Sequence, residues 1–203
     1  MKVAFGLKAH SGWAALVTVG TRDGDLVVVD RRRIELVEHA WEKQPYHAAA
    51  GMNPSGARAV VTRGVEAAHR IALQEMLASV NRERERGNEV TACAVLVGNP
   101  MPAWSIAEIL AVHFRMHKAE GVLFREALVS AARTCGLRQV PIPEKQLTAH
   151  AERQLGAPMS RLVKTLATLG KSVGSPWGKD QKDAALAAVV ALRTPSGRPT
   201  SRP

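Results

Sequence analysis

The sequence of 203 residues contains very little cysteine and few aromatic residues. Its two cysteines, Cys93 and Cys135, lie far apart in the chain and show none of the short spacings that bind zinc. This pattern excludes a disulfide framework and a cysteine-based metal site. Reduced thiols are typical of intracellular proteins, and we expect a cytoplasmic location.

The sequence also lacks a long apolar run. A membrane-spanning helix needs about 20 apolar residues, whereas the apolar N-terminal stretch, "MKVAFGLKAH", is interrupted by Lys8. We therefore expect neither a signal peptide nor contact with a membrane. The glycine-rich fingerprints of Walker and Rossmann loops are absent, which argues against the common forms of nucleoside triphosphate chemistry.

The sequence has fewer acidic than basic residues. The chain has 18 Asp and Glu against 28 Lys and Arg, a formal net charge of +10. Such an excess attracts phosphate-rich partners, so DNA and RNA are the partners to consider. The final stretch "RTPSGRPTSRP" mixes arginine with Pro, Ser and Gly. Its composition predicts a flexible basic tail over 193–203, following a single domain over 1–192.

The first 40 residues predict three antiparallel strands. Apolar runs cover 3–9, 13–19 and 26–37. The sequence His10-Ser11-Gly12 is typical of a tight turn, and the segment 21–25 contains the Asp-Gly pair of a hairpin loop. These strands therefore form a meander.

Helices and strands alternate along the rest of the chain. Apolar residues recur at steps of three and four over 57–86, which predicts a helix. The run "VTACAVLV" at 90–97 is typical of a strand buried on both faces. A second long helix is predicted from Ser105, with Glu108 in a capping box, to Cys135. A strand at 139–142 and helices at 144–155, 159–169 and 179–192 follow. The order predicts an α/β fold with a mixed five-stranded sheet, in which three antiparallel strands precede βαβ crossovers, flanked by helices.

The last predicted helix begins with two acidic residues, Asp180 and Asp183, in the stretch "GKDQKDAALAAVVAL". An aspartate here caps free N–H groups and lies at the positive end of the helix dipole. The pattern Asp-x-x-Asp-Ala also resembles the start of the last helix in RuvC-type Holliday-junction resolvases. The segment "GLKAHSG" at 6–12 resembles that family's first strand and turn. Together with the order of elements from 3 to 192, these motifs resemble the ribonuclease-H-like fold.

The resemblance implies a degenerate acidic site. In that family, carboxylates on the first strand, the fourth strand and the last helix hold two divalent ions that activate water. Here Lys8 replaces the first-strand carboxylate, and the stretch "ACAVLVGNP" has none. The remaining pair, Asp180 and Asp183, has too few oxygens for Mg²⁺. The resemblance therefore implies a noncatalytic protein without a cofactor, in which the Lys8 ammonium pairs with Asp183 in place of a metal ion.

A second polar pattern lies on the long helix predicted from Ser105. His113, His117 and Glu120 share one face, at a spacing that can bind a transition metal but is also typical of a solvated helix face. An active endonuclease that uses Mg²⁺ or Mn²⁺ is the alternative function. It would draw these three residues, or Glu66 of the preceding helix, toward the two aspartates.

The stretch "WEKQPYHAA" at 41–49 combines polar and aromatic residues where a loop is expected. Rigid elements often present such loops to ligands, so Tyr46 and His47 are candidate site residues. The alternative is a packed crossover in which Tyr46 and Trp41 cover the sheet edge.

Four further residues are candidates for nucleic-acid contact. Strand alternation places Arg31 and Arg33 on one face of the third strand. Trp177 could stack a base, with Lys179 beside it. Protection of the sheet edge by the arginines and core packing of Trp177 are the alternatives.

Three classes of function remain open. We favour a noncatalytic ribonuclease-H-like protein that binds nucleic acid through a basic surface. The alternatives are the metal-dependent nuclease or Holliday-junction resolvase and a scaffold protein that binds no nucleic acid, because a fold does not dictate a function. Many resolvases are dimers, so the resemblance leaves a homodimer open beside a monomer.

Overall fold

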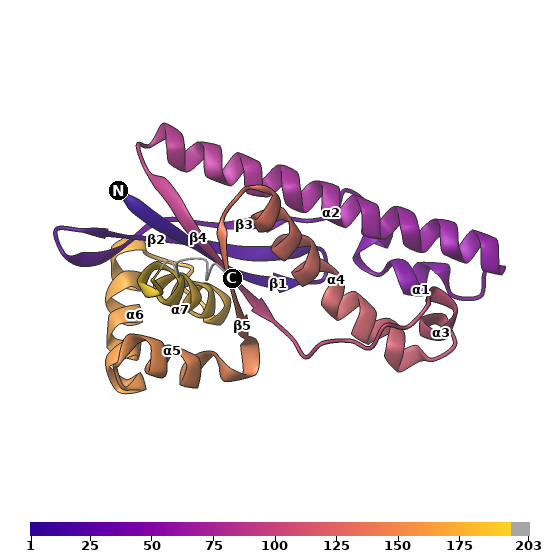
Figure 1. Cartoon of the computed structure of the whole chain (residues 1–203). Helices are drawn as coiled ribbons and strands as arrows, with labels where there is room; N and C mark the ends of the chain where they lie inside the picture. Colours follow the sequence, from indigo (N-terminus) through magenta and orange to yellow (C-terminus); the bar gives the residue numbers. More distant parts are fainter. Residues whose placement is uncertain (196–203) are drawn as a thin grey trace, which may run out of the picture.

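Figure 1 shows the chain as a computed structural model, which describes residues 1–195. The strands are β1 (Lys2–His10), β2 (Trp13–Arg22), β3 (Asp25–Glu35), β4 (Glu89–Val97) and β5 (Arg138–Pro143). The α-helices are α1 (Pro45–Ala49), α2 (Pro54–Glu85), α3 (Ile106–Leu110), α4 (His113–Thr134), α5 (Leu147–Leu155), α6 (Met159–Val173) and α7 (Lys179–Arg193). Short 3₁₀ turns, η1 (Ala40–Lys43) and η2 (Glu144–Gln146), precede α1 and α5. Of the expected basic tail, residues 196–203 lie outside the described part of the chain.

The strands form one mixed sheet in the order β3-β2-β1-β4-β5. The first three pair antiparallel, whereas β4 is parallel to β1 and β5 is parallel to β4. The hairpin between β2 and β3 turns at Asp23 and Gly24, which both have positive φ angles, as an Asp-Gly hairpin requires. The predicted α/β fold class and the order of its elements are confirmed.

Helices cover both faces of the sheet. One apolar core lies between the sheet and α5, α6 and α7, and a second lies between the sheet and α2 and α4 (Figure 1). Side chains alternate along a strand. β1 therefore directs Ala4 and Lys8 toward α7, and Phe5 and Leu7 toward α2 and α4. Full burial of one such leucine contributes about 1.5–3 kcal/mol.

β1 and α7 are in close backbone contact at Gly6. A Cβ atom at this position would overlap the backbone carbonyl of Ala184 and lie 2.7 Å from the amide nitrogen of Ala188. The buried face of α7 is itself rich in alanine. Small side chains on both elements therefore bring the helix backbone against the strand, and the first turn of α7 lies near the end of β1.

Two local predictions were wrong. The helix predicted from Ser105 to Cys135 is broken, because Val112 has an extended backbone with φ −139 and ψ 114. The break lets Ile109 of α3 and Met116 of α4 pack together in a small apolar cluster with α1. The stretch at 41–49 is also not a loop, since it forms most of η1 and the whole of α1. No helix within residues 1–195 has both the length and the apolar character that crossing a bilayer requires.

Candidate functional site

Lys8 lies near the end of β1 and is surrounded by three carboxylates. Its Nζ atom lies 2.7 Å from Asp183 Oδ2, 3.2 Å from Asp180 Oδ1 and 3.3 Å from Glu144 Oε1. Lys8 is only 5% exposed, so its ammonium depends on these oxygens in place of water. We call these four residues the Lys8 cluster. The structure brings together the three residues that the resemblance suggested and adds Glu144.

Three elements position the Lys8 cluster. Asp180 and Asp183 lie on one face of the first turns of α7, since residues three apart are neighbours on a helix. Glu144 directly follows β5. Because β1, β4 and β5 run parallel to one another, their carboxyl ends lie at the same edge of the sheet. Sequence reasoning missed Glu144, and its position directly after a parallel strand was the available signal.

The charges of the Lys8 cluster are balanced by further cations. Lys179 Nζ lies 2.6 Å from Asp183 Oδ2, and the Arg125 guanidinium donates a hydrogen bond of 3.0 Å to Glu144. Three carboxylates therefore face three cations. Burial opposes the charge of Lys8, but its hydrogen bonds to the two aspartates outweigh this effect, and the pKa of Lys8 lies above its ordinary value. The ammonium therefore persists throughout the physiological pH range.

This arrangement determines what the Lys8 cluster can do chemically. Mg²⁺ requires near-octahedral oxygen ligands at about 2.0–2.1 Å. In the Lys8 cluster, an ammonium group lies among the carboxylates that would supply those oxygens. An ammonium group donates hydrogen bonds but cannot bind a water molecule as a Lewis acid and lower its pKa. The geometry thus supports charge balance and helix anchoring.

Arg33, a predicted nucleic-acid contact, is bound on its own sheet. Its guanidinium lies 2.5 Å from Glu35 Oε1 and 4.1 Å from the ring centre of Trp13. On its other side, Trp13 stacks on His10, with ring centres 4.3 Å apart. His10 Nε2 lies 3.1 Å from Asp180 Oδ2, although outside hydrogen-bond geometry. Arg33 therefore joins a stack that ends at the Lys8 cluster.

Arg31 and Trp177 hold the segment between α6 and α7. Arg31 donates hydrogen bonds of 3.0 Å to the carbonyls of Val173 and Ser175, and a further bond to the Pro176 carbonyl. Trp177 Nε1 donates to a carbonyl of α6 at 3.0 Å, and its ring packs on α6 at a glycine. These contacts favour the alternative interpretation of Trp177, core packing, and show Arg31 fastening the segment between α6 and α7 to β3.

A second cluster lies where α1 meets α4. One nitrogen from each of His47, His113 and His117 lies within 4.8 Å of the other two. Glu120, the third residue of the predicted metal triplet, instead binds His47 Nδ1 at 2.7 Å and accepts backbone N–H bonds of 3.1 Å from Tyr46 and His47. His47 therefore takes the position expected for Glu120. We call the three histidines the histidine cluster.

The environment of Glu120 also accounts for Tyr46. The Glu120 side chain is 3% exposed and caps the start of α1 through its two backbone hydrogen bonds. Burial and the neighbouring Glu120 carboxylate raise the pKa of the Tyr46 hydroxyl. Tyr46 packs in the apolar cluster between α1 and α4. The tyrosine thus has a packing role, but it packs among the helices and not over the sheet edge as the alternative interpretation had it.

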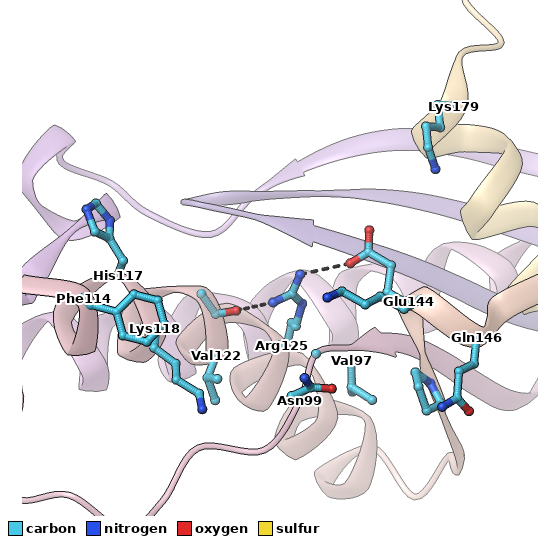
Figure 2. Close-up of a pocket in the computed structure, with 14 residues that line it drawn as sticks. Val97, Asn99, Phe114, His117, Lys118, Val122, Arg125, Glu144, Gln146 and Lys179 are labelled. Carbon is cyan, nitrogen blue, oxygen red and sulfur yellow. Dashed lines mark hydrogen bonds and ion pairs between the residues drawn. The ribbon is translucent and has the colours of Figure 1, made fainter.

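A groove of about 810 Å³ lies between α4, the ends of β4 and β5, and the start of α7. Figure 2 shows Phe114, His117 and Lys118 at one end of it, Lys179 at the other, and the Arg125–Glu144 pair between them. Lysine and arginine outnumber acidic residues in its lining, with Lys118, Arg125, Lys145 and Lys179 against Glu144. We call this feature the basic groove. Of the four predicted nucleic-acid contacts, it contains Lys179.

Glu66, proposed for a rearranged nuclease site, lies on α2. It lines a separate depression together with His39, Trp41 and Arg70. The carboxylates within 4 Å of Lys8 Nζ in the described part of the chain come from α7 and from the end of β5. The structure therefore does not bring Glu66 to the two aspartates.

Comparison with known proteins extends this description. No protein-family model matches the chain, and no curated protein matches it. Among solved structures, RuvC from Thermus thermophilus is similar over 93% of this chain and 91% of its own, with a TM-score of 0.50 and 11% identity. The chain has a ribonuclease-H-like fold. At this identity the likeness concerns the fold and not the chemistry.

Two further solved structures match the chain with lower TM-scores. Thermus thermophilus RuvC in complex with a Holliday junction substrate matches 94% of this chain and 92% of its own, with a TM-score of 0.47 and 12% identity. A Ppx/GppA family member from Aquifex aeolicus matches 74% of this chain and 38% of its own, with a TM-score of 0.37 and 11% identity.

Proposed function

We propose that this protein is a noncatalytic ribonuclease-H-like protein that binds nucleic acid in the basic groove. The proposal rests on one observation: the Lys8 cluster and the basic groove lie side by side at one edge of the sheet. There an ammonium group lies among the acidic residues, and the basic groove begins beside them at Arg125, Glu144 and Lys179. A chain that combines a basic groove with an ammonium group in the place of a metal ion would bind its partner without cutting it.

The absence of catalysis rests on the Lys8 cluster. Its carboxylates are engaged by Lys8, Lys179 and Arg125. Displacing Lys8 by a divalent ion would require a buried ammonium to leave its three acceptors, which has a large cost. We therefore expect no cleavage of DNA or RNA in the presence of Mg²⁺ or Mn²⁺.

The binding of nucleic acid rests on the basic groove. Arg125 and Lys179 are paired with carboxylates, whereas Lys118 and Lys145 have no carboxylate within 4 Å among residues 1–195, and these two lysines have the chemistry that neutralises phosphates and releases counterions. Phe114 lines the same groove and is 71% exposed, more than any other exposed large apolar side chain within residues 1–195. An exposed aromatic ring beside cations is how sequence-tolerant proteins stack the bases of single strands. We therefore propose single-stranded or branched nucleic acid as the partner.

The test is fluorescence anisotropy with labelled single-stranded DNA, duplex DNA, RNA and a four-way junction, at two salt concentrations. The groove variant carries Lys118→Ala, Lys145→Ala and Lys179→Ala. A control variant carries Arg58→Ala, Arg82→Ala and Lys171→Ala, which changes the net charge equally at exposed positions. We expect the groove variant to lose about tenfold or more in affinity and about 2 units of salt slope on single strands.

The aromatic contribution has its own variant. Phe114→Ala removes one stacking platform, which is worth about 1–3 kcal/mol per base, and should weaken the binding of single strands more than that of duplex.

Equal losses of affinity in the groove and control variants would contradict the groove assignment. Failure of every nucleic acid to bind would favour the scaffold alternative. Metal-dependent cleavage that Asp183→Asn abolishes would establish the nuclease alternative instead.

A further inference from the structure

The histidine cluster contains a nitrogen that lacks a hydrogen-bond partner. His47 Nε2 is buried and unpaired in the structure. The other ring nitrogen, Nδ1, lies 2.7 Å from Glu120 Oε2. A carboxylate only accepts, so Nδ1 carries the proton, and a neutral His47 has its lone pair on Nε2. A buried lone pair without a donor is costly unless something else binds it.

The two histidines of α4 place two further ring nitrogens in the same cluster, where one Nε2 donates a hydrogen bond to the other, and a metal ion would take the place of the shared proton. His113 and His117 lie one helical turn apart, and their Nε2 atoms are 3.0 Å apart. Two nitrogens bound to one tetrahedral zinc ion at about 2.0–2.1 Å lie about 3.3 Å apart. The ring centres of His47 and His117 lie 4.6 Å apart, and those of His47 and His113 lie 5.1 Å apart. With one nitrogen from each ring within 4.8 Å of the other two, the three histidines are close enough to reach one metal ion after small side-chain movements.

We propose that the histidine cluster binds Zn²⁺ through one nitrogen from each of His47, His113 and His117. Glu120 is the positioning residue, because its bond to Nδ1 selects the tautomer that directs His47 Nε2 toward the metal. A carboxylate that holds a ligating histidine in this way is a regular feature of zinc sites. Glu120 is also fixed by the backbone N–H groups of Tyr46 and His47.

The ligand set selects among metals. Three neutral imidazoles suit zinc, copper, nickel and iron rather than Mg²⁺ or Ca²⁺, which prefer oxygen. Three protein ligands also leave a fourth position on a tetrahedral ion for water or another small ligand. Because His47 lies on α1 and the other two ligands lie on α4, the ion would join two elements that are distant in sequence. His117 also lines the basic groove, so the zinc site would share a wall with it.

The test uses the full-length protein, freed of metal and kept reduced, with Zn²⁺ followed by calorimetry and Co²⁺ followed by visible absorption. We expect one equivalent of Zn²⁺ to bind, the absorption of a four-coordinate Co²⁺ centre, and a rise in melting temperature on binding. His117→Ala, at an exposed position, should weaken Zn²⁺ by on the order of 100-fold or more. Glu120→Gln should weaken it by about 10–100-fold.

The matched control is His150→Ala on α5, which removes a histidine remote from the histidine cluster and should leave Zn²⁺ affinity unchanged. Absence of stoichiometric binding would overturn the proposal. Binding that survives His117→Ala unchanged, or that His150→Ala removes, would equally overturn it. The result does not depend on nucleic-acid binding, so this proposal and the proposed function fail separately.

Discussion

The Lys8 cluster and the histidine cluster belong to different layers of the protein. They differ in whether the chain itself supplies a cation to the polar atoms of the cluster. In the Lys8 cluster, carboxylates from α7 and the end of β5 surround an ammonium group that the chain itself supplies. In the histidine cluster, Glu120 binds a histidine whose second nitrogen is buried without a partner. The Lys8 cluster thus contains its own cation, the Lys8 ammonium, whereas the histidine cluster contains three nitrogens that we propose bind one.

The comparison shows why an acidic pair alone is a poor sign of a metal site. Asp180 and Asp183 have the spacing of metal ligands but face Lys8 and Lys179. The histidine cluster differs in having three neighbouring ring nitrogens, with His47 Nε2 buried without a hydrogen-bond partner and its ring fixed by Glu120. Only the three-dimensional arrangement reveals that difference.

The largest effect is expected from separating α7 from β1. Gly6→Ala introduces a Cβ against the backbone of Ala184, which cannot move away without shifting the helix. We expect a loss of about 3 kcal/mol or more in the free energy of unfolding, measured by urea denaturation. The change disrupts the Lys8 cluster and leaves α1 and α4 in contact. Gly121→Ala is the matched control, because its Cβ would meet only the Arg125 side chain, at 3.9 Å. As an exposed helix position, it should gain up to about 1 kcal/mol.

Removing the internal cation is the next test. Lys8→Met leaves three carboxylates facing one another without their central donor. Breaking a fully buried ion pair costs about 3–5 kcal/mol, and because these carboxylates reach solvent we expect about 2 kcal/mol. Lys179→Met removes a 79% exposed partner of Asp183 and should cost less than about 1 kcal/mol. Equal costs for the two lysines would contradict the central role of Lys8.

Replacing Glu120, the carboxylate that binds His47 of the histidine cluster, should have a smaller effect on stability. Glu120→Gln weakens the buried hydrogen bonds to His47 and to the start of α1, and we expect a loss of about 1–2 kcal/mol in the metal-free protein. Glu126→Gln, on the exposed face of the same helix, should change stability by less than about 0.5 kcal/mol. If Glu120→Gln left the free energy of unfolding unchanged, this carboxylate would not anchor α1.

The smallest effect concerns alkaline pH. The pKa of Lys8 is raised in the folded protein because its carboxylate partners outweigh the opposing effect of burial. Below the unfolded-state pKa of about 10.4, Lys8 is charged in both states, and its stabilising contribution is complete. That contribution is lost only as pH rises from there through the raised folded pKa. The stability difference between the wild type and Lys8→Met should therefore stay constant from about pH 7 to 9.5. A steady decline over that range would contradict the raised pKa.

Local patterns accounted for most of the fold. The apolar runs of the meander and the central strand at 90–97 needed no distant information, because alternation and burial are written in neighbouring residues. The break at Val112 was not predictable, since neither proline nor glycine marks it. Tertiary packing of Ile109 and Met116 against α1 produced it.

The candidate sites were predictable only in part. The relation of Lys8 to Asp183 followed from the resemblance, because family order assigns the first strand and the last helix to one place. Glu144 and Arg125 were missed, since their contribution depends on where β5 ends and on how α4 lies beside it. His47 had been singled out separately from His113. Nothing in the sequence indicated that the stretch around it folds into a helix against α4.

The most direct test of the account is calorimetric titration of Mn²⁺ into the His117→Ala protein, which removes the proposed zinc site and leaves the Lys8 cluster intact. If Lys8 takes the place of a metal ion, this protein should bind no stoichiometric Mn²⁺, and adding Lys8→Asp should create a site that Asp183→Asn abolishes. Stoichiometric Mn²⁺ binding by His117→Ala alone, lost on adding Asp183→Asn, would contradict the account and indicate a working metal centre.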